Sequence, residues 1–281
     1  MRVRIRPMTD ADIPAAMRLV DDAGWNQTSA DWSRFLDAGS EGCLAATCGD
    51  AVVGTTTSIV YDGRLAWIGM VLVDASYRRQ GIGTALLRRA LRYLDEQGVA
   101  CIKLDATPQG KPLYASLGFV PEYDVARWVL HRDRTNRAAA PAAPRETLDD
   151  ALRLDRACFG ADRSRLLRSL DAEAPGFTRV SRHEGQVVGY AFGRRGLRAD
   201  HLGPWVARNA ETAAHLLDAF LSRSHRELVF VDGLREHAWA VPLLQARGFV
   251  LARPLIRMYQ GTNTTPARPG LLGAILDPAF G

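Results

Sequence analysis

The chain has 281 residues, of which 47% are hydrophobic and 24% charged. At about 100–200 residues per domain this length predicts two domains, and the apolar fraction excludes a disordered protein. No run of about 18 apolar residues is present for a membrane-spanning helix, and the basic residues near Met1 precede no apolar stretch of the kind that a secretory signal contains. The four cysteines form no CxxC pair, and two cores of this size need no disulfides. We therefore expect a cytoplasmic protein with no membrane partner.

The net charge is +5, and almost all of the positive charge comes from arginine. Lys103 and Lys111 are the two lysines, so the other 34 of the 36 basic residues are arginines. They are scattered over both halves of the chain, whereas nucleic-acid binding requires a basic stripe or patch. We attribute the charge to a general preference for arginine and expect no nucleic-acid partner.

The first 131 residues alternate short strands and amphipathic helices. In chain order the patterns predict strand 3–6, helices that follow caps at 9–10 and 28–29, strands 44–47, 52–61 and 65–73, helix 82–94, strand 99–105, helix 113–117, and final strands 119–120 and 125–130. Asp62-Gly63 predicts a hairpin turn, and Gly69 inside a strand indicates a bulge. This order predicts an α/β (α+β) fold whose mixed, mostly antiparallel sheet has helices on both faces.

Two short motifs recur in the second half of the chain. Gly49–Gly54 is echoed by Glu184–Gly189, and Gly118-Phe119-Val120 by Gly248-Phe249-Val250, at offsets of 135 and 130 residues. In both copies of the Gly-Phe-Val motif, an arginine followed by a large apolar residue lies nine residues after the glycine, at Arg127-Trp128 and Arg257-Met258. The repeats predict two tandem copies of one domain. We place them at 1–131 and 146–281, with an Ala/Pro-rich linker at 132–145 and a C-terminal tail from about Thr264.

The segment from Val71 to Ala85 joins a strand to the helix with the most regular apolar spacing, through a loop that contains Gly81 and Gly83. Unpaired amides of a first helical turn bind anions, and Arg78 and Arg79 add positive charge. No lysine follows Gly83, which excludes a P-loop, and the third small residue of a dinucleotide fingerprint is absent. A diphosphate is the anion that suits this loop.

Arg78-x-x-Gly81-x-Gly83 resembles the coenzyme A loop of the GNAT superfamily of N-acetyltransferases. The stretch 104–119 is similar to a second motif of that family through Leu113, Tyr114, Gly118 and Phe119, although Thr107 and Gly110 stand where asparagine and alanine are usual. Residues 24–27 and the second copy resemble a bacterial tandem group of GNAT proteins that includes YitH-like proteins. The resemblance covers nearly the whole chain.

The resemblance implies direct transfer of an acetyl group from acetyl-CoA to an amine in a ternary complex. It implies Tyr114 as the general acid that protonates the leaving thiolate, and backbone amides of the strand before the loop as donors to the carbonyl oxygen. The residues expected to bind acetyl-CoA are Val71, Leu72, Val73, Arg78, Arg79, Gln80, Gly81, Ile82, Gly83, Thr84, Thr107 and Gly110. Trp25, Asn26 and Asp105 are expected near the acceptor.

The general base and the acceptor stay open. Asp105 is one candidate base, with Asp21, Asp22 and Asp74 as weaker ones, and no histidine precedes His131. The acceptor is a small-molecule amine or an amine of a protein, with polyamine, amino acid, aminoglycoside and protein terminus all compatible. A non-catalytic acyl-CoA sensor or interaction module, transfer of a longer acyl chain, and a monomer or homodimer are also compatible with the sequence.

The second copy lacks the predicted chemistry. The 130-residue offset places Glu211 at the position of Gly81, Ala213 at that of Gly83 and Leu244 at that of Tyr114. A glutamate repels a diphosphate, and a leucine has no proton to donate. We expect one active site, in 1–131, with the second copy covering the acceptor cleft or acting as a dimerising or structural partner. The six histidines have no metal-binding spacing, so we expect no metal.

Overall fold

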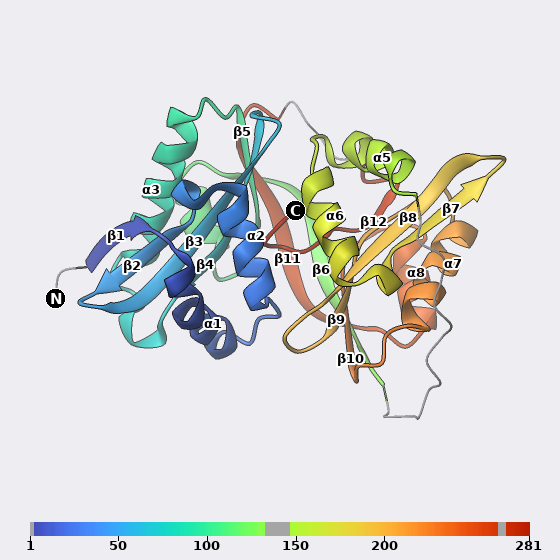
Figure 1. Cartoon of the computed structure of the whole chain (residues 1–281), viewed down its shortest axis with the longest axis horizontal. Coiled ribbons are helices and arrows are strands. Elements are labelled where there is room, and N and C mark those ends of the chain that lie inside the picture. The colour runs from blue at the N-terminus through green and yellow to red at the C-terminus, as the bar shows by residue number, and fades with distance from the viewer. Residues whose placement is uncertain (1–2, 133–146, 264–267) are drawn as a thin grey trace.

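The computed structural model describes residues 3–132, 147–263 and 268–281. The predicted linker lies outside the described residues except for Arg132. Two halves lie side by side (Figure 1), and their elements follow the same order from α1 to β6 and from α5 to β11. The first half contains β1 (Val3–Pro7), α1 (Ile13–Asp22), α2 (Ser29–Gly39), β2 (Leu44–Cys48), β3 (Ala51–Tyr61), β4 (Leu65–Val73), α3 (Ile82–Glu96), β5 (Cys101–Ala106), α4 (Lys111–Ser116) and β6 (Val120–His131). The second contains α5 (Asp149–Phe159), α6 (Ser164–Glu173), β7 (Arg179–His183), β8 (Gln186–Arg195), β9 (Asp200–Ala207), α7 (Ala210–Leu221), β10 (Leu228–Leu234), α8 (Ala240–Ala246), β11 (Val250–Gly261) and β12 (Leu272–Ala274).

Local sequence signals explain most element boundaries. Thr28 caps α2 in a capping box with Asp31, and Asp62 and Gly63 both adopt positive φ, as a tight hairpin turn requires. The two predicted final strands of the first copy are wrong, because residues 120–131 form the single strand β6. Apart from the parallel pairs β4–β5 and β9–β10, the strand pairs are antiparallel, as predicted.

The last strand of each half is exchanged with the other half. The strand order is β1-β2-β3-β4-β5-β11-β6-β10-β12-β9-β8-β7, so β11 pairs with β5 and β6 pairs with β10 within one continuous sheet. Figure 1 shows β6 and β11 crossing the centre of the molecule together. Trp128 of β6 packs in the core of the second half, and Met258 of β11 packs in that of the first. The predicted boundary at residue 131 therefore divides the chain but not the sheet.

Helices cover both faces of the sheet in the first half. α3 packs against β2, β3 and β4, with Leu86 and Leu87 fully buried, whereas α1 and α2 contact β3 from a separate core. The core beneath α1 and α2 also contains Phe159 and Phe192 of the second half. It therefore joins the two halves.

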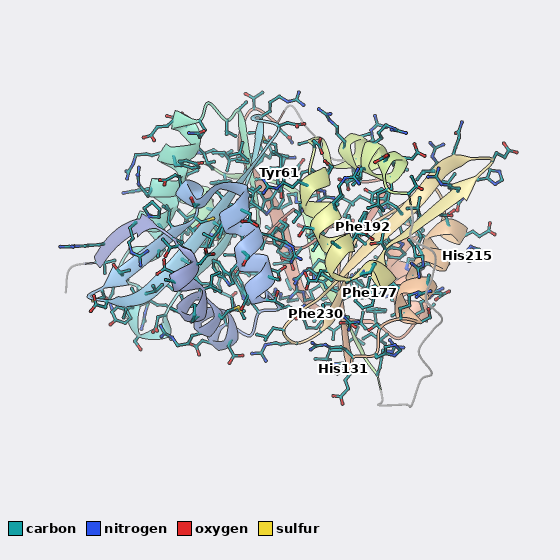
Figure 2. The ribbon with its side chains drawn as sticks, in the orientation of Figure 1. Tyr61, His131, Phe177, Phe192, His215 and Phe230 are labelled. Carbon is teal, nitrogen blue, oxygen red and sulfur yellow. The ribbon has the colours of Figure 1, made fainter. Side chains whose placement is uncertain are left out.

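The described part of the predicted tail is not an appendage of the second copy. Residues 275–281 are buried between the halves, near the chain end marked C in Figure 1. The Trp67 indole donates to the carbonyl of Pro278 (3.0 Å), and the Tyr61 hydroxyl, near the middle of Figure 2, donates to that of Phe280 (2.9 Å). A Cβ on Gly69 would lie 2.7 Å from the Ala279 carbonyl oxygen. Glycine is thus needed at 69 to let the tail approach β4.

A buried charge cluster also joins the halves. Arg194 donates to Asp31 of α2 (2.8 Å) and to Asp277 of the tail, and His201 lies between Asp277 and Asp232 (3.3 and 3.1 Å). Burial alone raises the pKa of a carboxyl group, but neighbouring arginines lower the pKa of Asp232 and Asp277 well below the usual range. The histidine and two aspartates have the spacing of metal ligands, but guanidinium groups already hold both carboxylates.

Candidate active site

A cavity of about 550 Å³ opens where β4 and β5 separate. The two strands pair in parallel only from Leu65 to Trp67 and from Cys101 to Lys103. Beyond those residues the cavity is lined by Ile68–Val73 of β4 on one side and by Asp105 and Thr107 on the other. The diverging strands leave backbone groups on one edge of β4 without a partner strand, so they are available to a ligand.

The predicted bulge lies in β4 next to Gly69. The pairing with β3 shifts register between Gly69 and Leu72, and Met70 has a φ of +51°. The Thr55 hydroxyl donates to the Met70 carbonyl (2.9 Å), which fixes the bulge from the β3 side. The bulge reorients the β4 backbone beside the cavity.

The glycine loop forms an open cradle before α3. Gly81 caps α3 with a φ of +79°, and no side chain within the described residues caps this end of the helix. No heavy atom lies within 4 Å of a Cβ built on Gly81, so glycine is required there for conformation rather than for space. Arg78 lies beside the cradle, where its Nε donates to the Val73 carbonyl (3.0 Å). The first-turn amides of α3 therefore point into unblocked space.

The predicted cofactor residues fall into three groups. Seven of them line the cavity: Val71, Leu72, Val73, Arg78, Gly83, Thr107 and Gly110. Gly81 and Thr84 line a neighbouring hollow together with Arg88, Arg89 and Arg92. Arg79, Gln80 and Ile82 line neither, and the side chain of Ile82, the first residue of α3, is buried in the core beneath that helix.

Tyr114 reaches the cavity from α4. Its ring packs edge-on against Phe119 with 6.1 Å between centroids, and a Cβ on Gly110 would lie 3.0 Å from the ring. Its hydroxyl has no hydrogen-bond partner among the residues that the structure describes. Burial raises the pKa of Tyr114 to about 12. The phenol therefore keeps its proton at neutral pH and has a free hydroxyl to donate it.

Of the residues predicted near the acceptor, Trp25 and Asp105 line the cavity and Asn26 does not. The Asn26 side chain is buried, where it donates to the Ala199 carbonyl (3.1 Å) and accepts from the amides of Arg198 and Ala199 (2.9 Å each). The expectation for Asn26 is therefore wrong. Its amide is used to hold the β8–β9 loop of the second half.

The candidate bases are mostly committed to other contacts. Both Asp105 oxygens accept hydrogen bonds from Arg257 (2.9 and 2.8 Å), Asp21 pairs with Arg198 (2.7 Å), and Asp74 accepts from the amide of Ser76 (2.9 Å). Asp22 is exposed at the cavity wall. These contacts leave Asp22 as the one of the four with a free carboxylate.

Sequence reasoning missed the part of the cavity that comes from the second half. The residues that the second half contributes are Arg253 and Leu255 of β11 and Pro278 and Ala279 of the tail. Gln27 and Arg127 of the first half also line the cavity, and the repeated arginine motif had marked Arg127. No sequence signal placed β11 beside β5 or the tail beside β4, and these two segments bring the residues of the second half to the cavity.

Comparison with known proteins agrees with this geometry. A profile described as "Acetyltransferase (GNAT) family" matches residues 13–119, and another, "Acetyltransferase (GNAT) domain", matches 151–272. The chain belongs to the GNAT superfamily of acetyltransferases. It is an acyltransferase with two GNAT domains in tandem, which confirms the predicted family and fold class.

Several relatives share the whole length of this acetyltransferase. YitH of Bacillus subtilis, described as an uncharacterized N-acetyltransferase, is 27% identical over 275 residues, which cover 96% of this chain and 95% of YitH. The structure of a putative acetyltransferase from Pyrococcus horikoshii matches with a TM-score of 0.83 and 26% identity, over 99% of this chain and 96% of that one. A tandem GNAT protein from the clavulanic acid biosynthesis pathway shares the fold, with a TM-score of 0.62 at 17% identity over 92% of this chain and 98% of that one. Within the described residues no helix combines the length and hydropathy needed to cross a bilayer.

Proposed function

We propose that this chain transfers an acetyl group from acetyl-CoA directly to a neutral acceptor amine, in a ternary complex in the cavity of the N-terminal half. The observation that carries the proposal is one cavity that contains Arg78 and Gly83 of the glycine loop, the bulged edge of β4 and Tyr114. Those three features are what binding a diphosphate, polarising a carbonyl group and protonating a thiolate require.

The residues along the cavity fit coenzyme A. The unblocked cradle at Gly81, with Arg78 beside it, suits the diphosphate, and the predicted residues Arg79, Gln80, Ile82 and Thr84 contribute through backbone amides. The free edge of β4 at residues 71–73, opposite Thr107 and Gly110, suits an extended arm with amide groups. GNAT acetyltransferases use acetyl-CoA as acetyl donor.

Acetyl-CoA supplies an activated acetyl thioester when it is bound at this site. Amides at the β4 bulge donate hydrogen bonds to the carbonyl oxygen as negative charge develops there. Tyr114 would act as the general acid, keeping its proton at Oη and donating it to the leaving thiolate sulfur of coenzyme A. Asp22, or water at the cavity mouth, accepts the proton that the attacking amine loses.

The structure of the second half supports a single active site. β9 and β10 pair in parallel from Asp200 to Leu202 and then separate, as β4 and β5 do. β12 pairs with both strands in that gap, so the chain's own backbone fills the space that corresponds to the cavity. A Cβ on Gly273 of β12 would lie 2.4 Å from Trp239, so the filling is tight.

Calorimetric titration with acetyl-CoA, followed by thiol release with a panel of amines, tests the proposal. We expect one acetyl-CoA per chain and amine-dependent release of free thiol. Two equivalent sites would contradict the assignment of the second half, and a chain that binds no acetyl-CoA would contradict the proposal itself. Binding with no turnover of any amine would favour a sensor.

A further inference from the structure

The cavity contains a guanidinium group that has no hydrogen-bond or ion-pair partner among the residues that the structure describes. Arg253 lies on β11, where the pairing with β6 shifts register between Leu251 and Arg253, and it lines the cavity together with Leu255. Its side chain makes no hydrogen bond or ion pair with any described residue, and its Nε is fully buried without a partner. Burial, followed by the positive charge of Arg127, lowers the pKa of Arg253, and the more weakly acting carboxylates of Asp232 and Asp277 offset this only in part. An anion beside Arg253 would offset both the desolvation of the guanidinium group and its repulsion by Arg127.

The buried arginines of the described residues are paired, whereas the half-buried Arg253 is not. Arg127 donates from Nε and Nη2 to Asp232 (2.8 and 2.6 Å), and Arg163 donates in the same way to Asp155 (2.9 Å each). Arg194 and Arg257 also each hold at least one aspartate. Because the fold supplies carboxylates to its buried guanidinium groups, the lack of a partner at the half-buried Arg253 points to a group that arrives from outside.

Gln27 provides a complementary acceptor in the same cavity. Its side chain is 4% exposed, and its Nε2 donates to Asp277 Oδ1 (2.8 Å). That contact fixes the orientation of the amide, because a carboxylate accepts only from the nitrogen. The Gln27 Oε1 atom has no partner among the described residues. It is placed to accept a hydrogen bond from an amine.

The other charges at this end are balanced, apart from an exposed carboxylate. Asp105 is held by Arg257, and Arg127 is held by Asp232. Asp22 is exposed and makes no ion pair with Arg253, so it attracts a cationic amine without neutralising that guanidinium group. The uncompensated groups thus suit a ligand with both an amine and an anion.

We propose that the acceptor is a small amine that carries an anionic group, a carboxylate or a phosphate, with Arg253 binding the anion and Gln27 accepting from the amine. This inference rests on the proposed acetyltransferase function. The cavity must also hold the acyl-bearing arm of coenzyme A, so its volume of about 550 Å³ favours a small acceptor. The C-terminal half then determines acceptor specificity through β11.

The test uses acceptor pairs that differ only in the anion. Thiol release from acetyl-CoA is measured with L-phenylalanine and phenethylamine, with L-leucine and isoamylamine, and with glucosamine 6-phosphate and glucosamine. The variants are Arg253→Met, Arg253→Lys and, as a matched control, Arg208→Met, because Arg208 is exposed and outside the cavity. Calorimetry with acetyl-CoA on each variant reports whether the cofactor site is intact.

We expect the unmodified protein to prefer the anionic member of a pair. Arg253→Met should lower kcat/KM for that member about 10- to 100-fold more than for the neutral member, as loss of a charged hydrogen-bond partner predicts. Arg253→Lys should lose less, and Arg208→Met should keep the preference. A response in the amino acid pairs identifies a carboxylate, and a response in the glucosamine pair alone identifies a phosphate.

Three results would overturn the inference. They are a preference for neutral amines, an Arg253→Met variant that slows both members of a pair equally, and no turnover of any anionic amine by a protein that binds acetyl-CoA. Failure of the unmodified protein to bind acetyl-CoA would instead contradict the proposed function. The two failures are therefore distinguishable.

Discussion

Replacing Arg257 with methionine tests whether the exchanged strand β11 holds the two halves together. Arg257 belongs to β11, and its Nε and Nη2 donate to both oxygens of Asp105 on β5 (2.9 and 2.8 Å). It also donates to the Tyr123 hydroxyl (2.5 Å), and its guanidinium carbon lies 4.4 Å from the ring centre of Trp67. Both members of the ion pair are almost fully buried.

The expected loss of stability follows from what each substitution leaves behind. Arg257→Met strands a carboxylate in a cavity wall, and breaking a buried pair in this way costs about 3–5 kcal/mol. Asp105→Asn strands the guanidinium group at a similar cost of about 3–5 kcal/mol. The double variant removes both charges and loses only the contacts to Tyr123 and Trp67, about 1–2 kcal/mol. The double variant should therefore be more stable than either single variant.

Urea unfolding followed by circular dichroism measures the four free energies of this cycle. A coupling energy of at least about 2 kcal/mol is expected for groups in direct contact. Additive losses, or an Arg257→Met variant less than about 1 kcal/mol below the unmodified protein, would refute a structural role for the pair. Thiol release by the double variant decides a separate question, because a folded protein without turnover would give Asp105 a role in catalysis.

Four further outcomes are expected. Tyr114→Phe should keep acetyl-CoA affinity by calorimetry while thiol release falls about 10²–10⁴-fold, and unchanged turnover would remove Tyr114 as the acid. Because burial raises the pKa of Tyr114 to about 12, the rate should show no loss from its ionisation up to about pH 10. Asp232 and Asp277 have lowered pKa values when folded. They thus stabilise the protein above about pH 4 and lose that contribution as pH falls further. Urea midpoints from pH 7 to 3 should fall accordingly, and less in Asp277→Asn; parallel pH curves would count against this cluster. Gly69→Ala should lower the unfolding free energy by about 1–3 kcal/mol through its clash with the tail, and a neutral effect would show that the tail moves freely.

Local patterns in the sequence predicted the first half closely. The spacing of Ile82, Leu86 and Leu94 predicts α3, and Gly81 is found in the left-handed conformation that a glycine-rich turn before a helix suggests. The coenzyme A motif and Tyr114 also came from short segments. Such features depend on residues that are neighbours along the chain, so they can be inferred without knowing what packs above them.

The acceptor end could not be inferred, because it depends on contacts between residues far apart in sequence. β6 and β11 carry the same Gly-Phe-Val and arginine pattern, so the sequence does not distinguish which of the two strands pairs with β5. Only the packed structure shows that β6 and β11 are exchanged, because Met258 of β11 packs in the core of the first half and Trp128 of β6 in that of the second half. Asn26 shows the same limit, since its partners lie more than 170 residues away.

The sequence by itself thus determined the two tandem copies and the glycine turn before α3, because each is encoded in contiguous residues, and it predicts that the second copy is inactive. The tertiary structure alone decided that β11 and the tail complete the cavity and that Arg253 lies there without an ion-pair partner among the described residues. Strand pairing leaves no mark on the order of residues along the chain. It is set by which buried surfaces and charges find partners when the two halves fold together.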